Sequence, residues 1–135
     1  HENDPSAMER LAKKGDLSQV DLMISDISTN DVGALPSHIT ASNFGKITSG
    51  TEKEDIALGL LNMVFQTIGM LSVFALRNDT VKDVVLTGSL ANMSIASQVM
   101  RVVEEISVVN FFIPENATFA TAIGAALPFV RNARI

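Results

Sequence analysis

No part of the chain limits the choice of fold as strongly as Ile56 to Leu76, IALGLLNMVFQTIGMLSVFAL, which carries no charged residue. A helix of this length could cross a bilayer. No basic flank sets an orientation, however, and four polar residues interrupt the segment, namely Asn62, Gln66, Thr67 and Ser72. We therefore favour a helix buried on nearly every side, by its own domain and by a second subunit, over a membrane span.

Polar residues mark the two ends of this helix. Thr51 followed by Glu54 is typical of a capping box, which predicts a start at about Glu52. The apolar pattern breaks near Arg77–Asn78, so we expect the helix to span 52–77.

The same helix predicts a homodimer. Gly59 and Gly69 let neighbours pack closely on several of its sides, and one 135-residue domain has trouble covering all of them. We expect that replacing Leu61 or Met70 with Glu dissociates or unfolds the protein.

Strands and helices alternate after the long helix. The pattern predicts a strand at Asp83–Thr87, a helix at Leu90–Glu105, a strand at Ser107–Ile113 and a helix from Pro114 to about Val130. Strands joined in this way run parallel through right-handed crossovers. Both strands are apolar on both faces, as a sheet covered by helices requires. The predicted fold class is α/β.

The chain upstream of the long helix is less regular. We expect a helix at Met8–Lys14 with Gly15 as its C-cap, a strand at Asp21–Ile27 and a loop at Ser28–Ser37. Residues 1–7 are polar and lack the apolar region of a signal peptide, so we expect a disordered or cloning-derived tail.

Composition argues against several kinds of function. The net charge is −5 without a basic cluster, which disfavours binding to nucleic acid or to an anionic membrane. The absence of cysteine excludes disulfides and thiolate metal sites and suits a cytoplasmic location. His1 and His38 are far apart in the sequence, and no metal-ligand spacing is present, so no metal site is expected in this chain.

The stretch VVLTGSLANM, Val84 to Met93, ends a predicted strand in Gly88 and Ser89. In open α/β sheets, ligands bind beyond the carboxyl ends of the strands. Gly88 would let a planar group or a phosphate approach the backbone, and Ser89 is placed to cap the next helix, whose amides can meet an anion. A tight turn without any ligand explains these residues equally well, because a lone glycine turn is a weak signal.

The last predicted helix carries small residues on one face: Ala117, Ala120, Thr121, Gly124 and Ala125. This face permits the close approach of a sheet, a helix or a ligand, and ordinary helix-on-sheet packing is the favoured interpretation. Glu115 and Asn116 are interpreted as helix-start residues rather than as catalytic ones.

Two carboxylates are candidates for catalysis. Asp21 and Asp26 flank the strand predicted upstream, and either could act as a base or as an Mg²⁺ ligand. Acids at strand ends are more often solvated or capping residues, which is the favoured interpretation here.

Several motifs in a fixed order resemble one enzyme family. VVLTGSLANM followed by PENATFATAIGAAL looks like the closing part of the acetate kinase, sugar kinase, Hsp70 and actin superfamily. MERLAKKGDLSQVDLMISDI followed by LPSHITASNFGK resembles the second half of type II pantothenate kinases, with their KGD, VDL, DI and TAxNFG patterns. The similarity extends from Met8 to Phe129, and its several separated motifs make it more specific than any one of them.

This resemblance implies that residues 8–135 form the C-terminal lobe of a ribonuclease H-like (actin-like ATPase) fold, with a short, mostly parallel sheet flanked by helices. It implies a kinase that transfers the γ-phosphoryl of ATP, with Mg²⁺, to pantothenate in coenzyme A synthesis. Gly88 and Ser89 would contact the nucleotide. Three residues match the segment near pantothenate and the dimer partner, namely Thr40, Ala41 and Asn43.

The resemblance also implies what this chain lacks. The family's phosphate loops and general base lie upstream of the matched region, and phosphoryl transfer needs both lobes. No catalytic residue is therefore expected in this chain, and the fragment alone is expected to be inactive. The alternatives are another kinase of the superfamily, such as an N-acetylglucosamine kinase, an ATPase of the benzoyl-CoA reductase activator type, or a non-catalytic dimerisation or regulatory module. The activator type is disfavoured, because it would be expected to carry iron–sulfur cysteines at its subunit junction and this chain has no cysteine.

Overall fold

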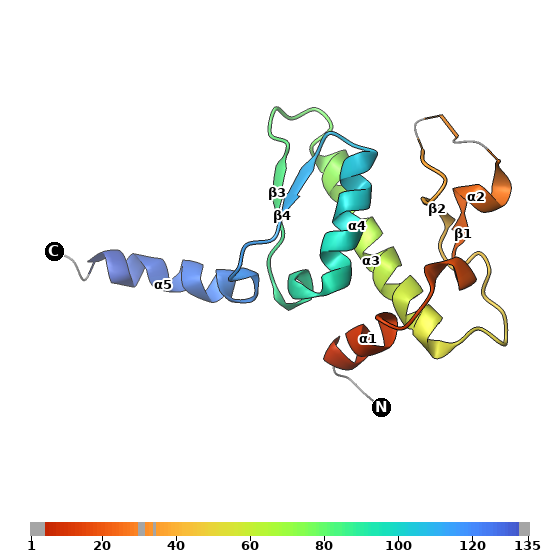
Figure 1. The fold of residues 1–135 in the computed structure, drawn as a ribbon. Coiled ribbons are helices and arrows are strands. Elements are labelled where there is room, and N and C mark those ends of the chain that lie inside the picture. The colour runs from red at the N-terminus through yellow and green to blue at the C-terminus, as the bar shows by residue number, and fades with distance from the viewer. Residues whose placement is uncertain (1–4, 30–31, 34, 133–135) are drawn as a thin grey trace.

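Figure 1 shows the chain as a computed structural model, which describes residues 5–29, 32–33 and 35–132. The fold is built around the central helix α3 (Lys53–Ala75), against which α1 (Pro5–Ala12) and α4 (Ser94–Glu105) pack. The mixed α/β class predicted from the sequence is confirmed.

Helices α3 and α4 pack through apolar stripes. In α4, Ala96, Val99 and Val103 recur at three- and four-residue spacing and are buried. They lie near the buried face of α3, which includes Leu61 and Phe65. Burying a side chain such as Val99 or Phe65 stabilises the fold by about 1.5–3 kcal/mol each.

Helix α3 begins and ends close to the predicted positions, with Glu52 as its N-cap. The predicted capping box is wrong, because the Thr51 hydroxyl accepts the backbone N–H of Thr48 at 2.9 Å instead. This chain alone does not bury α3 on every side, since Leu71 and Phe74 are each 62% exposed. Burial of these residues by a second subunit stays a prediction. By length and composition α3 could cross a membrane, a test that core helices of soluble proteins pass too.

In the described residues, two separate strand pairs replace the expected single, mostly parallel sheet. Strands β3 (Asp83–Val85) and β4 (Asn110–Phe112) are parallel, as predicted, with Val84 opposite Phe111. Strands β1 (Leu22–Met23) and β2 (Thr40–Ser42) form an antiparallel pair at the other side of α3. The outer face of β3–β4 is exposed rather than covered.

The strand predicted at Asp21–Ile27 is wrong after its third residue. The chain turns into the short helix α2 (Ile24–Ile27), because the Asp26 carboxylate accepts the Met23 N–H at 2.7 Å and pairs with Lys46. In the loop that follows, residues 30, 31 and 34 lie outside the described residues.

The N-terminal helix begins earlier than expected. Pro5 to Ala7 belong to α1 rather than to a tail, and Ala7 is buried, while residues 1–4 lie outside the described part of the chain. Gly15 is not a left-handed C-cap. A Cβ on Gly15 would lie 2.4 Å from the Glu54 carbonyl oxygen, so this glycine permits a close backbone approach to α3.

The last helix, α5 (Ala120–Asn132), extends away from the rest of the molecule after a 3-10 turn at Ala117–Phe119. Residues 121–130 are all exposed, so the helix-on-sheet packing favoured above is not found within the chain. The 3-10 turn before the helix is joined to the segment after β3 by Asn92, whose amide donates to the Thr118 hydroxyl at 2.6 Å.

Candidate functional site

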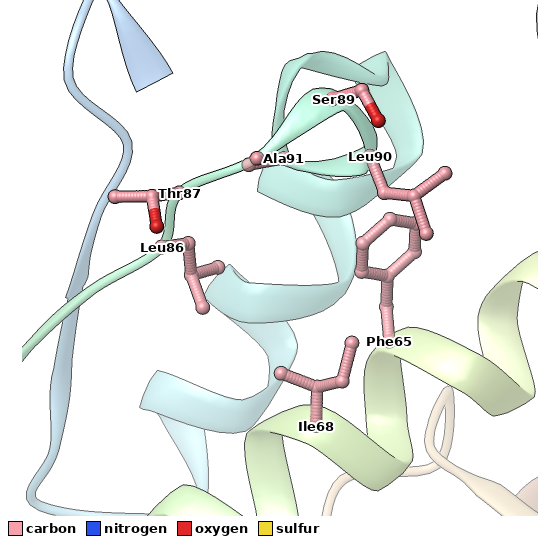
Figure 2. A pocket seen from close by; sticks show the side chains of 8 residues that line it. Phe65, Ile68, Leu86, Thr87, Ser89, Leu90 and Ala91 are labelled. Atoms are coloured by element: carbon pink, nitrogen blue, oxygen red, sulfur yellow. The ribbon is translucent and has the colours of Figure 1, made fainter. Parts of the chain in front are cut away.

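A pocket of about 330 Å³ lies between α3 and the turn that follows β3. Figure 2 shows Phe65 and Ile68 pointing from α3 toward Leu86 and Leu90, with Ser89 farther from α3 in this view. Segment 86–91 forms the rest of the wall, including Thr87, Gly88 and Ala91. The volume is at the lower end of the range that small-molecule sites occupy.

The turn at Gly88 is held open by its backbone. Gly88 has φ of +99°, a conformation that residues with a side chain rarely adopt, and its N–H donates to the Ala117 carbonyl at 2.9 Å. A Cβ built on Gly88 would meet no atom within 4 Å. The turn is therefore not filled by neighbouring side chains.

Ser89 does not cap α4, contrary to the sequence-based prediction. A 3-10 turn at Ser89–Asn92 comes first, and Met93 is the N-cap residue of α4. The Glu9 carboxylate occupies the helix start, where it accepts both the N–H and the hydroxyl of Ser94 at 3.0 Å. An anion is therefore not expected at this helix terminus, which already holds a carboxylate.

Glu9 reaches this position from α1. The Ser94 backbone N–H and then the Lys13 ammonium, 3.1 Å away, hold the pKa of Glu9 below its ordinary value. Glu9 thus joins α1 to the segment that leads out of the pocket, and no motif in the sequence pointed to it.

The pocket suits a planar apolar group better than a phosphate. Its floor is Phe65, which is buried, and its rim includes Leu90, which is exposed. Thr87 and Ser89 supply hydroxyl groups, and none of the eight described lining residues is charged. A nucleobase could stack against such a surface, whereas the phosphates of a nucleotide would need donors from elsewhere.

Thr40 and Asn43 both donate hydrogen bonds to Asp21. The Asp21 carboxylate is 0% exposed and accepts the Thr40 hydroxyl at 3.2 Å and the Asn43 amide at 3.3 Å. It also accepts the Asn62 amide of α3 at 2.9 Å and the Phe44 N–H at 2.8 Å. Together these five residues are the Asp21 cluster, which ties the turn after β2 to α3.

The cluster bears on the interpretation of Asp21. The residue is buried and both of its oxygens accept hydrogen bonds from this chain, which favours a structural role over that of a base or a metal ligand. Its burial also differs from the solvated or capping role favoured above. Asp26 does have a capping role, because its carboxylate accepts the Met23 N–H at the start of α2. The Lys46 ammonium and then the Met23 N–H hold the pKa of the Asp26 carboxyl below its ordinary range. Of the three residues matched to the TAxNFG segment, Ala41 alone is exposed.

Other candidates lie near the pocket without lining it. Glu115 is exposed, and Asn116 is the N-cap of the 3-10 turn that precedes α5, which agrees with their interpretation as helix-start residues. In the described residues, no group of three or more His, Cys, Asp or Glu side chains could hold a metal ion.

Comparison with known proteins gives matches over nearly the whole chain. The family model described as Fumble matches residues 2–128. A type II pantothenate kinase of Oceanobacillus iheyensis is 30% identical over 87% of this chain and 46% of its own length. Proteins of the same name from Staphylococcus haemolyticus and Staphylococcus epidermidis are 26% and 29% identical, each over 90% of this chain and 48% of their own length.

The chain spans about half the length of the curated relatives it matches. The motif-based resemblance to type II pantothenate kinases is confirmed by these relatives and by the family model. Because that model covers all but a few residues at either end, the chain belongs to the Fumble family.

Proposed function

We propose that this chain is the C-terminal lobe of a pantothenate kinase with a ribonuclease H-like (actin-like ATPase) fold. The complete enzyme would transfer the γ-phosphoryl of ATP to pantothenate in the cytoplasm, using Mg²⁺. The observation that carries the proposal is the open apolar pocket beside Gly88, in a chain whose relatives are named pantothenate kinases.

In this proposal the pocket receives the adenine of ATP. Phe65, Ile68 and Leu86 offer an apolar surface, and the bare backbone of Gly88 allows the ring to lie close. Ser89 stays a nucleotide-contacting residue at the edge of the pocket. The phosphates and Mg²⁺ would be held by the part of the enzyme that precedes this chain, so the chain alone would not turn over ATP.

The exposed side of α3 supports the homodimer. Ile56, Leu71 and Phe74 are exposed and Met63 is half-buried, and their spacing of seven, eight and three residues places all four on the side of α3 opposite the buried stripe. Two copies packed through these residues would cover apolar surface that one copy leaves in water.

The observations bear differently on the two alternatives, another kinase of the superfamily and a non-catalytic module. The relatives found here favour pantothenate over an amino sugar as substrate, because all three carry the name type II pantothenate kinase. A non-catalytic dimerisation module has one observation in its favour, the lack of charged side chains around the pocket.

Calorimetric titration of ADP into the purified chain tests the pocket. We expect binding to be lost in Ser89→Trp, whose indole would fill the pocket mouth, and kept in Ser97→Trp, a matched variant at an exposed site on α4. Binding that is equal in the two variants, or absent from the unaltered chain, would contradict the proposed nucleotide site.

A further inference from the structure

The two edges of the β3–β4 pair are not alike. The Leu86 N–H donates to the Phe112 carbonyl at 2.8 Å, and the Asn110 N–H donates to the Lys82 carbonyl at 2.8 Å. Backbone groups in a ladder alternate between its two sides, so even-numbered residues of this segment face β4. Asp83 and Val85 therefore direct their N–H and C=O groups to the opposite edge.

On the outer edge of β4, a backbone N–H is already hydrogen-bonded within the chain. There the Phe111 N–H donates to a Glu104 carboxylate oxygen at 2.6 Å, and Glu104 belongs to α4. The outer edge of β3 has no such cover: in the described part of the chain the sheet contains these two strands and no third. An unpaired edge of this kind is a template for an added strand.

The outward face of the pair is apolar at the end nearest the pocket. Val85 and Phe112 lie opposite each other in register and are 60% and 51% exposed. Phe111, on the inward face, packs against the core. Parallel strands are normally covered on both faces, so this pair lacks a cover as well as a neighbour.

We propose that the edge of β3, together with Val85 and Phe112, is the docking surface for the part of the enzyme that precedes this chain. That part would add a strand beside β3, with side chains alternating so that its apolar ones extend the Val85 face. The proposal rests on the proposed function only in taking this chain as one half of a longer enzyme.

The observations favour this occupant over a second copy. The relatives are about twice as long as the region that matches, so they contain enough chain to supply the strand and the cover. Two copies joined edge to edge through β3 would leave Val85 and Phe112 of both copies in water. The added strand would run toward Leu86 and Gly88, so it would also border the pocket.

Hydrogen exchange can test the docking surface. The probe is this chain fused in place of the matching half of the Oceanobacillus iheyensis relative, compared with the chain alone. We expect the Val85 amide to exchange at least about tenfold more slowly in the fusion, because it gains a backbone acceptor. The Phe111 amide, already bonded to Glu104, should change little. Equal exchange of Val85 in both proteins, or protection that rises with the concentration of the chain alone, overturns the proposal.

Co-expression of the two halves as separate chains gives a measurement that does not depend on the fusion. The unaltered chain should retain the upstream half on purification, and Val85→Lys should retain at least about tenfold less. Val108→Lys is the matched control, because Val108 is 75% exposed and outside the strand pair. No retention by the unaltered chain, or equal retention by the two variants, overturns the proposal. Failure of the nucleotide site alone would instead abolish ADP binding and leave retention unchanged.

Discussion

Asp21 brings a carboxylate into the interior, where its hydrogen-bond donors among the described residues are all neutral. Its Oδ2 accepts three groups, from Thr40, Asn43 and Asn62. In Asp21→Asn, an amide placed at Oδ2 would face those donors, and one placed at Oδ1 would face the Phe44 N–H. Since unsatisfied buried groups destabilise by about 1–3 kcal/mol each, we expect a loss of about 3 kcal/mol in unfolding free energy, measured by urea denaturation.

Asp79→Asn is the control for that substitution. Asp79 is exposed and accepts the Val81 N–H through one oxygen, which an asparagine can also do. Its effect should stay within about 0.5 kcal/mol. If Asp21→Asn is equally mild, the Asp21 cluster is not what holds the turn against α3.

Gly15 is constrained by space rather than by backbone conformation. A Cβ there would lie 2.4 Å from the Glu54 carbonyl oxygen, a backbone atom that cannot turn aside. We expect Gly15→Ala to destabilise the fold by about 1–3 kcal/mol. Gly124→Ala, at an exposed helical site with nothing within 4 Å of the new Cβ, should instead be neutral or slightly stabilising in the same thermal denaturation series.

Glu9 predicts a pH dependence of stability. Its pKa in the folded chain is lowered from an ordinary value of 4.5 by the Ser94 N–H and by Lys13. A lowered folded pKa means that the stabilisation is fully present above 4.5 and is lost as the pH falls through the folded pKa. Thermal unfolding of the unaltered chain and of Glu9→Gln should therefore differ at neutral pH and converge in acid. A constant difference at all pH values would contradict this role, and Glu115→Gln, at an exposed site, should match the unaltered chain throughout.

In the proposed homodimer, α3 would present opposite faces to two different neighbours, the core of its own chain and the second copy. Leu61 is buried against the core, whereas Leu71 is largely exposed. We now expect Leu61→Glu to unfold the chain and Leu71→Glu to dissociate the dimer while leaving the monomer folded, because a charge is tolerated only at the second site. Circular dichroism together with light scattering separates the two outcomes. A folded monomer from the unaltered chain would contradict the dimer.

The elements that could be predicted from the sequence are those with a strong period. Helix α3 and the parallel pairing of β3 with β4 follow from long or repeated apolar patterns. The same kind of pattern wrongly predicted a strand through Asp21–Ile27. The conformation after Met23 depends on Asp26 and on Lys46, which lies about twenty residues away in the sequence. Contacts that join distant segments leave no local pattern.

The residues of the candidate site also differ in whether the sequence could predict them. Gly88 could be found because it ends an apolar run, and the structure places it at an open pocket. Phe65 and Ile68 line that pocket from α3, but nothing in the sequence distinguishes them from other apolar residues of the helix. Thr40 and Asn43 matched a motif, and hydrogen bonding to buried Asp21 accounts for donor side chains at both positions.

For the complete enzyme, the proposed binding of the base by this chain and of the phosphates by the other half makes a measurable prediction about ligand preference. The lining of the pocket offers apolar contacts and two hydroxyls but no charge, so the base would carry the binding free energy in this chain. Adenosine, ADP and ATP should therefore bind the chain alone with dissociation constants within about threefold of one another, a difference below about 0.7 kcal/mol. The fusion with the upstream half of the Oceanobacillus iheyensis relative should prefer ATP over adenosine by at least about tenfold, because phosphate donors and Mg²⁺ are then present. Calorimetry on both proteins decides the matter. A tenfold preference for ATP in the chain alone would mean that this half already contacts the phosphates, and the assignment of base and phosphates to different halves would be wrong.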